Sequence, residues 1–170
     1  MVGTFEEAQV AATFDACEMR TMFISNYDYE SSSYLPIAIP GHDGWFVIGK
    51  GSTRVAVLSP SNVIYKLHLY NEGPFNQREA SYRKSLPDVI GICRVADSTL
   101  YNVNDEPVLA MEYIELPFAP KGQNSWDNDS LNKEIVRIEA DCLEYEIYDV
   151  HDGNLGRDKD GTPVLIDYAG

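Results

Sequence analysis

The stretch 149–154 reads Asp-Val-His-Asp-Gly-Asn, and thirteen residues after its asparagine the chain has Asp167 at the end of an apolar run. Between them, Asp-Lys-Asp-Gly at 158–161 predicts a hairpin turn, which would let Asn154 and Asp167 face one site. Mg²⁺ prefers carboxylate and amide oxygens together with phosphate oxygens. We therefore predict Asn154 and Asp167 as metal ligands, with Asp149 as the acceptor of a proton from a substrate hydroxyl group.

Patterns on both sides of this stretch predict a mixed α+β chain. Helical spacing of apolar residues covers 5–23 and 130–147, and 75–85 reads as a short helix between two prolines. Turn residues separate short strand-like runs at 45–48, 55–58, 63–67, 89–95, 108–113 and 164–166. We expect an N-terminal helix and connector (1–44), a five-stranded antiparallel part with one helix (45–115), and a much reduced helical part (116–170).

The composition restricts the classes of partner. The 170 residues include 13 Lys and Arg against 27 Asp and Glu, a net charge of −14. Such a field repels phosphate groups, so we expect no direct binding to nucleic acid or to an anionic membrane. The three cysteines are far apart and odd in number, which predicts buried free thiols rather than disulfides or a zinc site. Without a signal sequence or a long apolar run, the expected location is the cytoplasm.

The C-terminal motifs resemble the protein kinase superfamily. Asp149 with Asn154 five residues later is similar to that family's catalytic loop, and Asp167-Tyr168-Ala169 stands where the family has Asp-Phe-Gly. The form Asp-x-His-x-Gly-Asn resembles small-molecule kinases of the aminoglycoside and choline type, and also the early protein kinases of podophages. Tyr148 replaces the arginine that regulated protein kinases place before the catalytic aspartate. That difference argues against control by phosphorylation of an activation loop.

The N-terminal half carries further resemblances. Residues 49–55 read Gly-Lys-Gly-Ser-Thr-Arg-Val, similar to a glycine-rich loop, and 63–66 read Val-Ile-Tyr-Lys, similar to the strand that carries the family's lysine. The resemblance implies that Lys66 grips the α- and β-phosphates of ATP and pairs with Glu79. It also implies that residues 110–114 form the adenine-binding hinge. The implied nucleotide-binding set is Gly49, Lys50, Gly51, Ser52, Lys66, Glu112 and Ile114, with Asp149, Lys66 and Glu79 as the catalytic set.

Three functions fit these features. The first is an ATP- and Mg²⁺-dependent phosphotransferase, a minimal Ser/Thr protein-kinase-like protein of kinase-like α+β fold. The second is a catalytically inactive kinase-like scaffold that binds and inhibits a basic host protein, and the third is an acidic DNA mimic. The chain ends three residues after Asp167, so it is either a truncation or a minimal form. In a minimal form, we expect the helix at 5–23 to cover the apolar face of the helix at 131–147.

Overall fold

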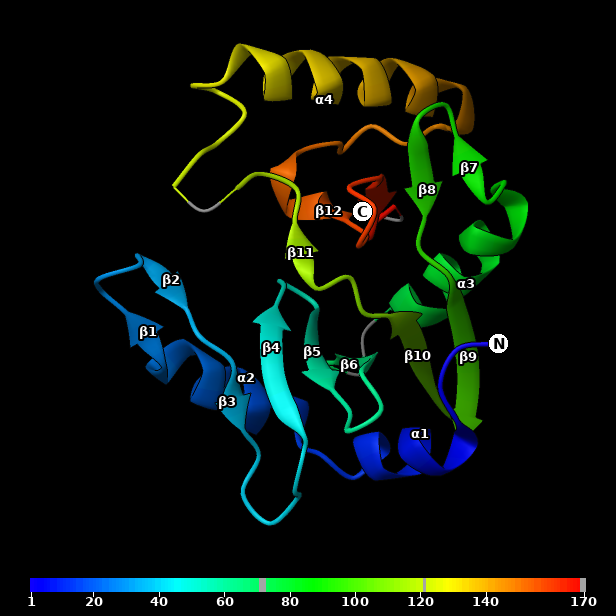
Figure 1. Cartoon of the computed structure of the whole chain (residues 1–170). Coiled ribbons are helices and arrows are strands. Elements are labelled where there is room, and N and C mark those ends of the chain that lie inside the picture. The colour runs from blue at the N-terminus through cyan, green and yellow to red at the C-terminus, as the bar shows by residue number, and fades with distance from the viewer. Residues whose placement is uncertain (71–72, 121, 169–170) are drawn as a thin grey trace. The chain divides into compact units, whose positions relative to one another are not determined.

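A computed structural model describes residues 1–70, 73–120 and 122–168 of the chain. The fold is mixed α+β and divides into two compact units (Figure 1). Unit 1 comprises Met1–Ala80 and Ser98–Tyr113, and unit 2 comprises Ser81–Asp97 and Ile114–Gly170. Residues 1–44, which we expected as a separate segment, belong to unit 1. Ala169, the last residue of the expected Asp-Tyr-Ala motif, lies outside the described residues.

Unit 1 is built on a six-stranded sheet in which all neighbouring strands are antiparallel. Its order is β3 (Ile37–Ala38), β4 (Phe46–Lys50), β5 (Arg54–Leu58), β6 (Val63–His68), β10 (Glu106–Glu112) and β9 (Ser98–Val103). The meander predicted over 45–67 is confirmed as β4, β5 and β6. The strand predicted at 108–113 is confirmed as β10.

The strand predicted at 89–95 is wrong. The chain turns at Gly91, which has φ +59°, and an added Cβ there would collide with the carboxylate of Asp141. The segment therefore splits into β7 (Val89–Ile90) and β8 (Cys93–Val95), which form a hairpin in unit 2. Instead, β10 pairs with β9, the strand that directly precedes it along the chain.

The N-terminal segment forms two helices rather than the single predicted one. Helix α1 (Phe5–Ala12) begins at Thr4, whose hydroxyl caps the helix by accepting a hydrogen bond from Glu7 N at 3.1 Å. Glu7 does not return the bond to the cap; its carboxylate accepts from the hydroxyls of Tyr65 and Ser61, both at 2.7 Å. Helix α2 (Ala16–Ser25) begins at a second cap, Asp15, which explains the break.

Helices α1 and α2 pack on one face of the unit 1 sheet. Their buried side chains share a core with the inward-facing residues of β5 and β6, a group that includes Ala8, Ala11, Met19, Phe23, Val55, Val57, Tyr65 and Leu67. The expectation that 5–23 covers the helix at 131–147 is therefore wrong. In a strand whose side chains alternate between buried and exposed, the apolar side chains lie on one face of the sheet, and that face must be shielded from water. Helices α1 and α2 shield it here. The connector after α2 contains the short strands β1 (Tyr27–Asp28) and β2 (Ser33–Tyr34).

Unit 2 has a second sheet and one long helix. The strand order is β11 (Leu116–Pro117), β12 (Leu155–Arg157), β13 (Pro163–Leu165), β8 and β7, with β13 and β8 parallel. Helix α4 (Asp129–Cys142) begins at the Asn128 cap and buries the predicted stripe Leu131, Ile135, Ile138 and Cys142. It ends before the predicted 147, where a 3₁₀ turn (Leu143–Tyr145) follows. Helix α3 (Phe75–Ser85) has the predicted bounds and runs across the division between the units.

All three cysteines are free thiols, as predicted. Burial raises the pKa of Cys93 to about 12 and that of Cys142 to about 11, so both stay protonated at neutral pH. Cys17 differs from the prediction because it is exposed. Among the described residues, no helix combines the length and apolar character that crossing a bilayer requires.

Replacing Met19 by alanine tests the position of α2. Met19 is only 5% exposed in the core beneath the sheet, so Met19→Ala is expected to lower the free energy of unfolding by about 2–5 kcal/mol. Ile24→Ala on the same helix is the control, because Ile24 is 38% exposed and should change it by less than about 1 kcal/mol. Urea unfolding measures both. Equal effects of the two substitutions would contradict the packing of α2 on the sheet.

Candidate functional site

Strand alternation places the candidate nucleotide residues of unit 1 on one face. Val55, Val57, Tyr65 and Leu67 face the core under α1 and α2. Successive side chains of a strand point to opposite faces, so Arg54, Lys66 and His68 point away from that core. The register pairs Arg54 with His68 and Ala56 with Lys66, which sets the three polar side chains close together.

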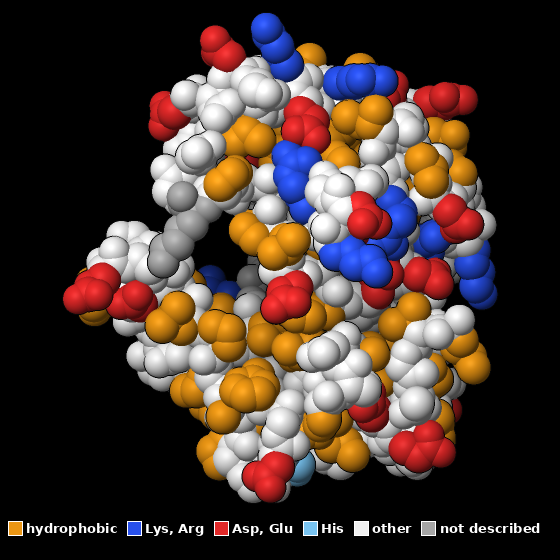
Figure 2. All heavy atoms as spheres, viewed as in Figure 1, with side chains coloured by type: hydrophobic (Ala, Val, Ile, Leu, Met, Phe, Trp, Pro, Cys, Tyr) orange, Lys and Arg blue, Asp and Glu red, His pale blue; other side chains and the backbone are white. Residues whose placement is uncertain are grey.

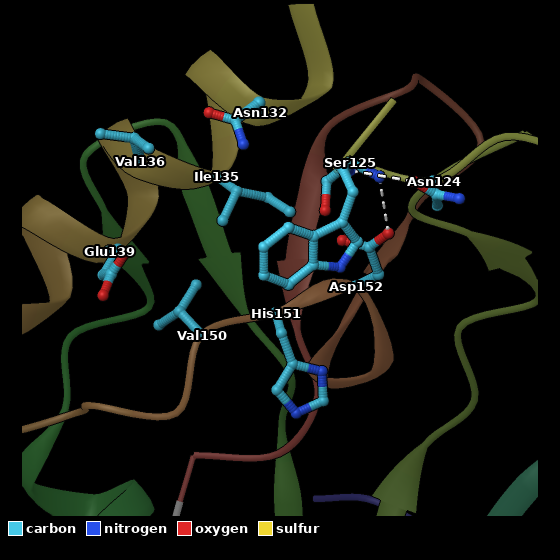
Figure 3. Close-up of a pocket in the computed structure, with 10 residues that line it drawn as sticks. Asn124, Ser125, Asn132, Ile135, Val136, Glu139, Val150, His151 and Asp152 are labelled. Atoms are coloured by element: carbon cyan, nitrogen blue, oxygen red, sulfur yellow. Dashed lines mark hydrogen bonds between the residues drawn. The ribbon is translucent and has the colours of Figure 1, made fainter. Parts of the chain in front are cut away.

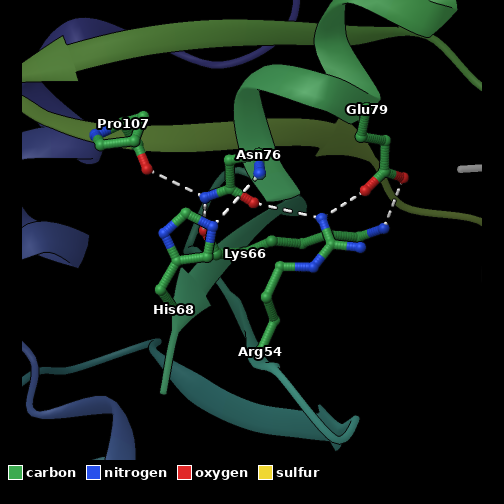
Figure 4. Close-up of polar contacts among 6 residues, drawn as sticks. All are labelled: Arg54, Lys66, His68, Asn76, Glu79 and Pro107. Atoms are coloured by element: carbon green, nitrogen blue, oxygen red, sulfur yellow. Dashed lines mark hydrogen bonds and ion pairs between the residues drawn. The ribbon is translucent and has the colours of Figure 1, made fainter. Parts of the chain in front are cut away.

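Helix α3 brings Glu79 to this face of the sheet (Figure 4). The Nζ atom of Lys66 lies 2.8 Å from Glu79 Oε1, which confirms the predicted ion pair. Arg54 pairs with the other carboxylate oxygen. The Glu79 side chain is fully buried, whereas Lys66 and Arg54 keep 13% and 15% of their side chains exposed. A buried carboxylate needs such partners, because its desolvation is otherwise very unfavourable.

Asn76, one turn before Glu79, fixes α3 to the sheet. Its side chain is fully buried, and Nδ2 donates to the carbonyl oxygens of Lys66 at 2.8 Å and Pro107 at 2.9 Å. Its Oδ1 accepts from Arg54 at 3.1 Å. Every side-chain polar atom of Asn76 is therefore used, and the bonds fix both the helix and the guanidinium group.

His68 caps the start of α3. Its Nε2 accepts a hydrogen bond from the backbone N–H of Asn76 at 3.2 Å, which requires that nitrogen to be unprotonated. Burial lowers the pKa of His68 below its ordinary value of 6.5, and the positive charge of Arg54 lowers it further. The ring is therefore neutral at physiological pH and serves as an acceptor.

The glycine-rich turn lies between β4 and β5. Gly51 N donates to Arg54 O at 2.8 Å, which closes the turn. An added Cβ at Gly49 or Gly51 would meet only ordinary contacts at 3.8 Å and 3.7 Å, so packing within the protein does not require glycine there. Lys50 lies with its Nζ 5.3 Å from the ring centroid of Tyr34. Ser52 lies in the turn itself, after the last residue of β4.

The expected hinge residues lie at the division of the chain. Glu112 ends β10, where it pairs in register with Val63 of β6. Ile114 is the first residue of the second segment of unit 2, and its side chain packs on Gly156 so closely that an added Cβ would lie 2.6 Å from Ile114 Cγ2. Their role in binding adenine stays a prediction.

Asp149 and Asn154 are joined in unit 2, as their spacing predicts. Asn154 Nδ2 donates to the Asp149 backbone oxygen at 2.9 Å and to its carboxylate at 3.2 Å. These bonds use the amide nitrogen, so the carbonyl oxygen of the amide is the atom left to bind a metal. His151 Nδ1 accepts a hydrogen bond from Gly153 N at 3.0 Å, so the ring bonds within the loop. The Asp149 side chain remains 69% exposed and so is open to a substrate.

The β12–β13 hairpin brings Asp167 beside this loop. Ile166 N donates a hydrogen bond to Asn154 O at 3.0 Å. Asp167 directly follows Ile166, so this bond holds it near Asn154. The Oδ1 atom of Asp167 is buried and has no hydrogen-bond partner within the described chain. An unpaired buried carboxylate oxygen of this kind fits a cation. Neither here nor elsewhere among the described residues does a group of three or more His, Cys, Asp and Glu side chains have metal-binding geometry.

A groove of about 610 Å³ adjoins the same loop (Figure 3). Val150 and His151, which directly follow Asp149, form part of its wall, and α4 contributes Ile135 and Val136. Asp152 Oδ2 accepts from Ser125 N at 3.1 Å, which attaches the loop at 124–126 to the floor of the groove. Most of its lining surface is apolar, although polar side chains also line it, as is common in binding grooves for small ligands or side chains.

Sequence reasoning missed three residues of the site. Arg54 stands in the 49–55 stretch without a role assigned to it, but the alternation of β5 shows that it shares a face with Lys66. Asn76 and His68 had no motif to mark them. Asn76 is a polar residue in the first turn of α3, and His68 is opposite Arg54 in the register of β5 with β6. Only the fold shows that these positions belong to the site.

A comparison of the sequence with protein-family profiles gave no match, and a comparison with curated proteins gave none.

The lowered pKa of His68 predicts a loss of stability in mild acid. Because the folded state resists protonation of His68, the unfolded state binds more protons between the folded pKa and 6.5. The free energy of unfolding should therefore fall as the pH drops below 6.5, and level off below the folded pKa. Urea unfolding of the parent and of His68→Gln at several pH values measures this contribution. His42→Gln is the matched control, and a His68 variant with the parent's pH dependence would contradict the prediction.

Proposed function

We propose that this protein is an ATP- and Mg²⁺-dependent phosphotransferase with a kinase-like arrangement of residues. The observation that carries the proposal is the buried carboxylate of Glu79, bonded by Lys66 from a neighbouring strand and by Arg54 at the end of a glycine-rich turn. A lysine positioned by a helix-borne glutamate is the group that kinases use on the α- and β-phosphates.

In unit 1, the residues around Glu79 suit the binding of a polyphosphate. Two cations against one carboxylate leave a local excess of one positive charge in a chain of net charge −14. The partial exposure of Lys66 and Arg54 leaves both accessible to an anion. Glycine at 49 and 51 is not needed for packing, but it would allow the backbone to approach a phosphate group.

In unit 2, Asn154 and Asp167 would hold Mg²⁺ through one amide and one carboxylate oxygen. The unpaired buried oxygen of Asp167 supports this role. The metal would neutralise charge on the phosphates during transfer. Asp149, held by Asn154, would accept a hydrogen bond from the acceptor hydroxyl and so orient it, and the groove bordered by Val150 and His151 would take the remainder of the acceptor. A Ser or Thr side chain of a protein is the proposed acceptor.

Replacing Asp167 by alanine should abolish Mg²⁺-dependent nucleotide binding and leave the fold intact. Its carboxylate would supply a metal ligand, and its buried Oδ1 has no hydrogen-bond partner among the described residues that the substitution would break. Isothermal titration with ATP, with and without Mg²⁺, measures the effect. Asp160→Ala in the same hairpin is the control, because Asp160 is exposed in the turn. If Asp167→Ala binds ATP·Mg²⁺ as the parent does, the metal assignment is wrong.

Replacing Asp149 by asparagine separates binding from chemistry. The exposed carboxylate is proposed to act on the acceptor and not on the nucleotide, so ATP·Mg²⁺ affinity should stay within about twofold. Phosphoryl transfer should fall by about 10²–10⁴-fold, the range typical of a lost general base. Labelled ATP, incubated with the protein alone and with a cell extract, measures transfer. Transfer at the parent's rate by Asp149→Asn, or no transfer by the parent itself, would contradict the proposed activity.

A further inference from the structure

A row of aromatic rings leads from the core of unit 1 to its surface through the β1–β2 hairpin. Phe23 is 5% exposed, and the centroid of its ring lies 5.5 Å from that of Tyr34. The Tyr34 ring meets Tyr27 edge to face at 5.0 Å, and Tyr27 meets Tyr29 in the same way, also at 5.0 Å. The two middle rings are partly exposed, Tyr34 at 39% and Tyr27 at 37%, and the outermost ring, Tyr29, is 87% exposed.

The hairpin that carries these rings is held in place by polar bonds. Asn26 Nδ2 donates to the carbonyl oxygens of Leu35 and Pro36 at 3.0 and 3.2 Å, and Leu35 N donates back to Asn26 O. At the other end, the carboxylate of Asp28 accepts from the backbone of Glu30 and Ser31. The exposed rings are therefore presented on an ordered frame, which lowers the entropy lost when a partner binds.

The surface is acidic as well as aromatic. Asp28 and Glu30 alternate with the tyrosines, and Figure 2 shows acidic side chains at the left edge, where Figure 1 places the β1–β2 turn, with hydrophobic ones beside them. One cation already uses this surface, since Lys50 Nζ lies 5.3 Å from the ring centroid of Tyr34. Tyrosine faces attract ammonium and guanidinium groups, and flanking carboxylates strengthen the attraction.

We propose that the aromatic surface formed by Tyr27, Tyr29, Tyr34 and Leu35 binds an arginine-rich segment of another protein. Guanidinium groups stack on tyrosine rings and pair with carboxylates, and tyrosine is enriched at the centres of protein interfaces. Three rings and a carboxylate are more than one small cation would cover, which favours a polypeptide. The net charge of −14 disfavours a phosphate-bearing partner at a surface that carries carboxylates and favours a basic one.

Lys50 of the expected nucleotide-binding set lies against Tyr34, but none of the four residues of the surface belongs to that set. The test therefore measures peptide binding and does not depend on phosphotransfer. The probe is a fluorescein-labelled peptide of alternating arginine and glycine, followed by anisotropy at low salt, with a glutamate–glycine peptide as the negative probe. The double variant Tyr29→Ser/Glu30→Gln removes one exposed ring and one charge from the hairpin. The control Tyr70→Ser/Asp105→Asn removes the same from elsewhere on unit 1, where Tyr70 is 59% exposed and asparagine tolerates the positive φ of Asp105.

The proposal expects the arginine peptide to bind the parent, with affinity about fivefold weaker for the hairpin variant and within about twofold for the control. Unchanged melting of the hairpin variant shows that the fold is kept. Equal losses in both variants would show general charge attraction and overturn the proposal. Absence of binding to the parent would also overturn it, as would a parent dimer that the hairpin variant converts to a monomer in sedimentation.

Discussion

The carboxylate of Glu79 has no access to solvent, and its burial constrains the structure around it. Removing one partner of a buried ion pair typically lowers the free energy of unfolding by about 3–5 kcal/mol. The cations must therefore stay close to the carboxylate in the folded state. Lys66 and Arg54 both bond Glu79, and Asn76 ties Arg54 and the helix to the carbonyl groups of β6 and β10. A helix otherwise poor in apolar side chains is thereby fixed to a sheet through polar bonds.

The same cluster connects fold and chemistry. The face of the sheet opposite α1 and α2 carries the charged groups, because strand alternation separates them from the core residues. In unit 2, hydrogen bonds give a second fixed arrangement. The Asn154 side chain holds Asp149, and the Asn154 backbone oxygen accepts from Ile166 N, next to Asp167. Each unit thus fixes its own set of groups before any ligand binds. Such preorganisation is what phosphoryl transfer requires of a protein.

The sequence predicted the local elements better than their tertiary placement. The meander, α3 and the C-terminal hairpin follow from turn residues and periodicity, and the Lys66–Glu79 pair follows from a motif spacing. The division of 89–95 into two strands could not be predicted from the sequence pattern. One glycine at positive φ divides an apparently continuous strand, and strand pairing depends on contacts with residues distant in the sequence. The amphipathic stripe of 5–23 predicted a buried face, but that face packs on the unit 1 sheet and not on the expected helix at 131–147. The cap at Asp15 divides the stripe into two helices. Sheet register brings Arg54 and His68 together, and Asn76 bonds both of them from α3; no sequence motif corresponds to either arrangement.

The central claim is that the paired cations and the glycine-rich turn of unit 1 bind the phosphates of a nucleotide. Titration of the ¹⁵N-labelled protein with ATP in the presence of Mg²⁺ tests it most directly through the backbone resonances. The account predicts that ATP·Mg²⁺ shifts the resonances of Gly49, Gly51 and Lys66. Resonances of these residues that stay in place at millimolar ATP·Mg²⁺ would contradict it.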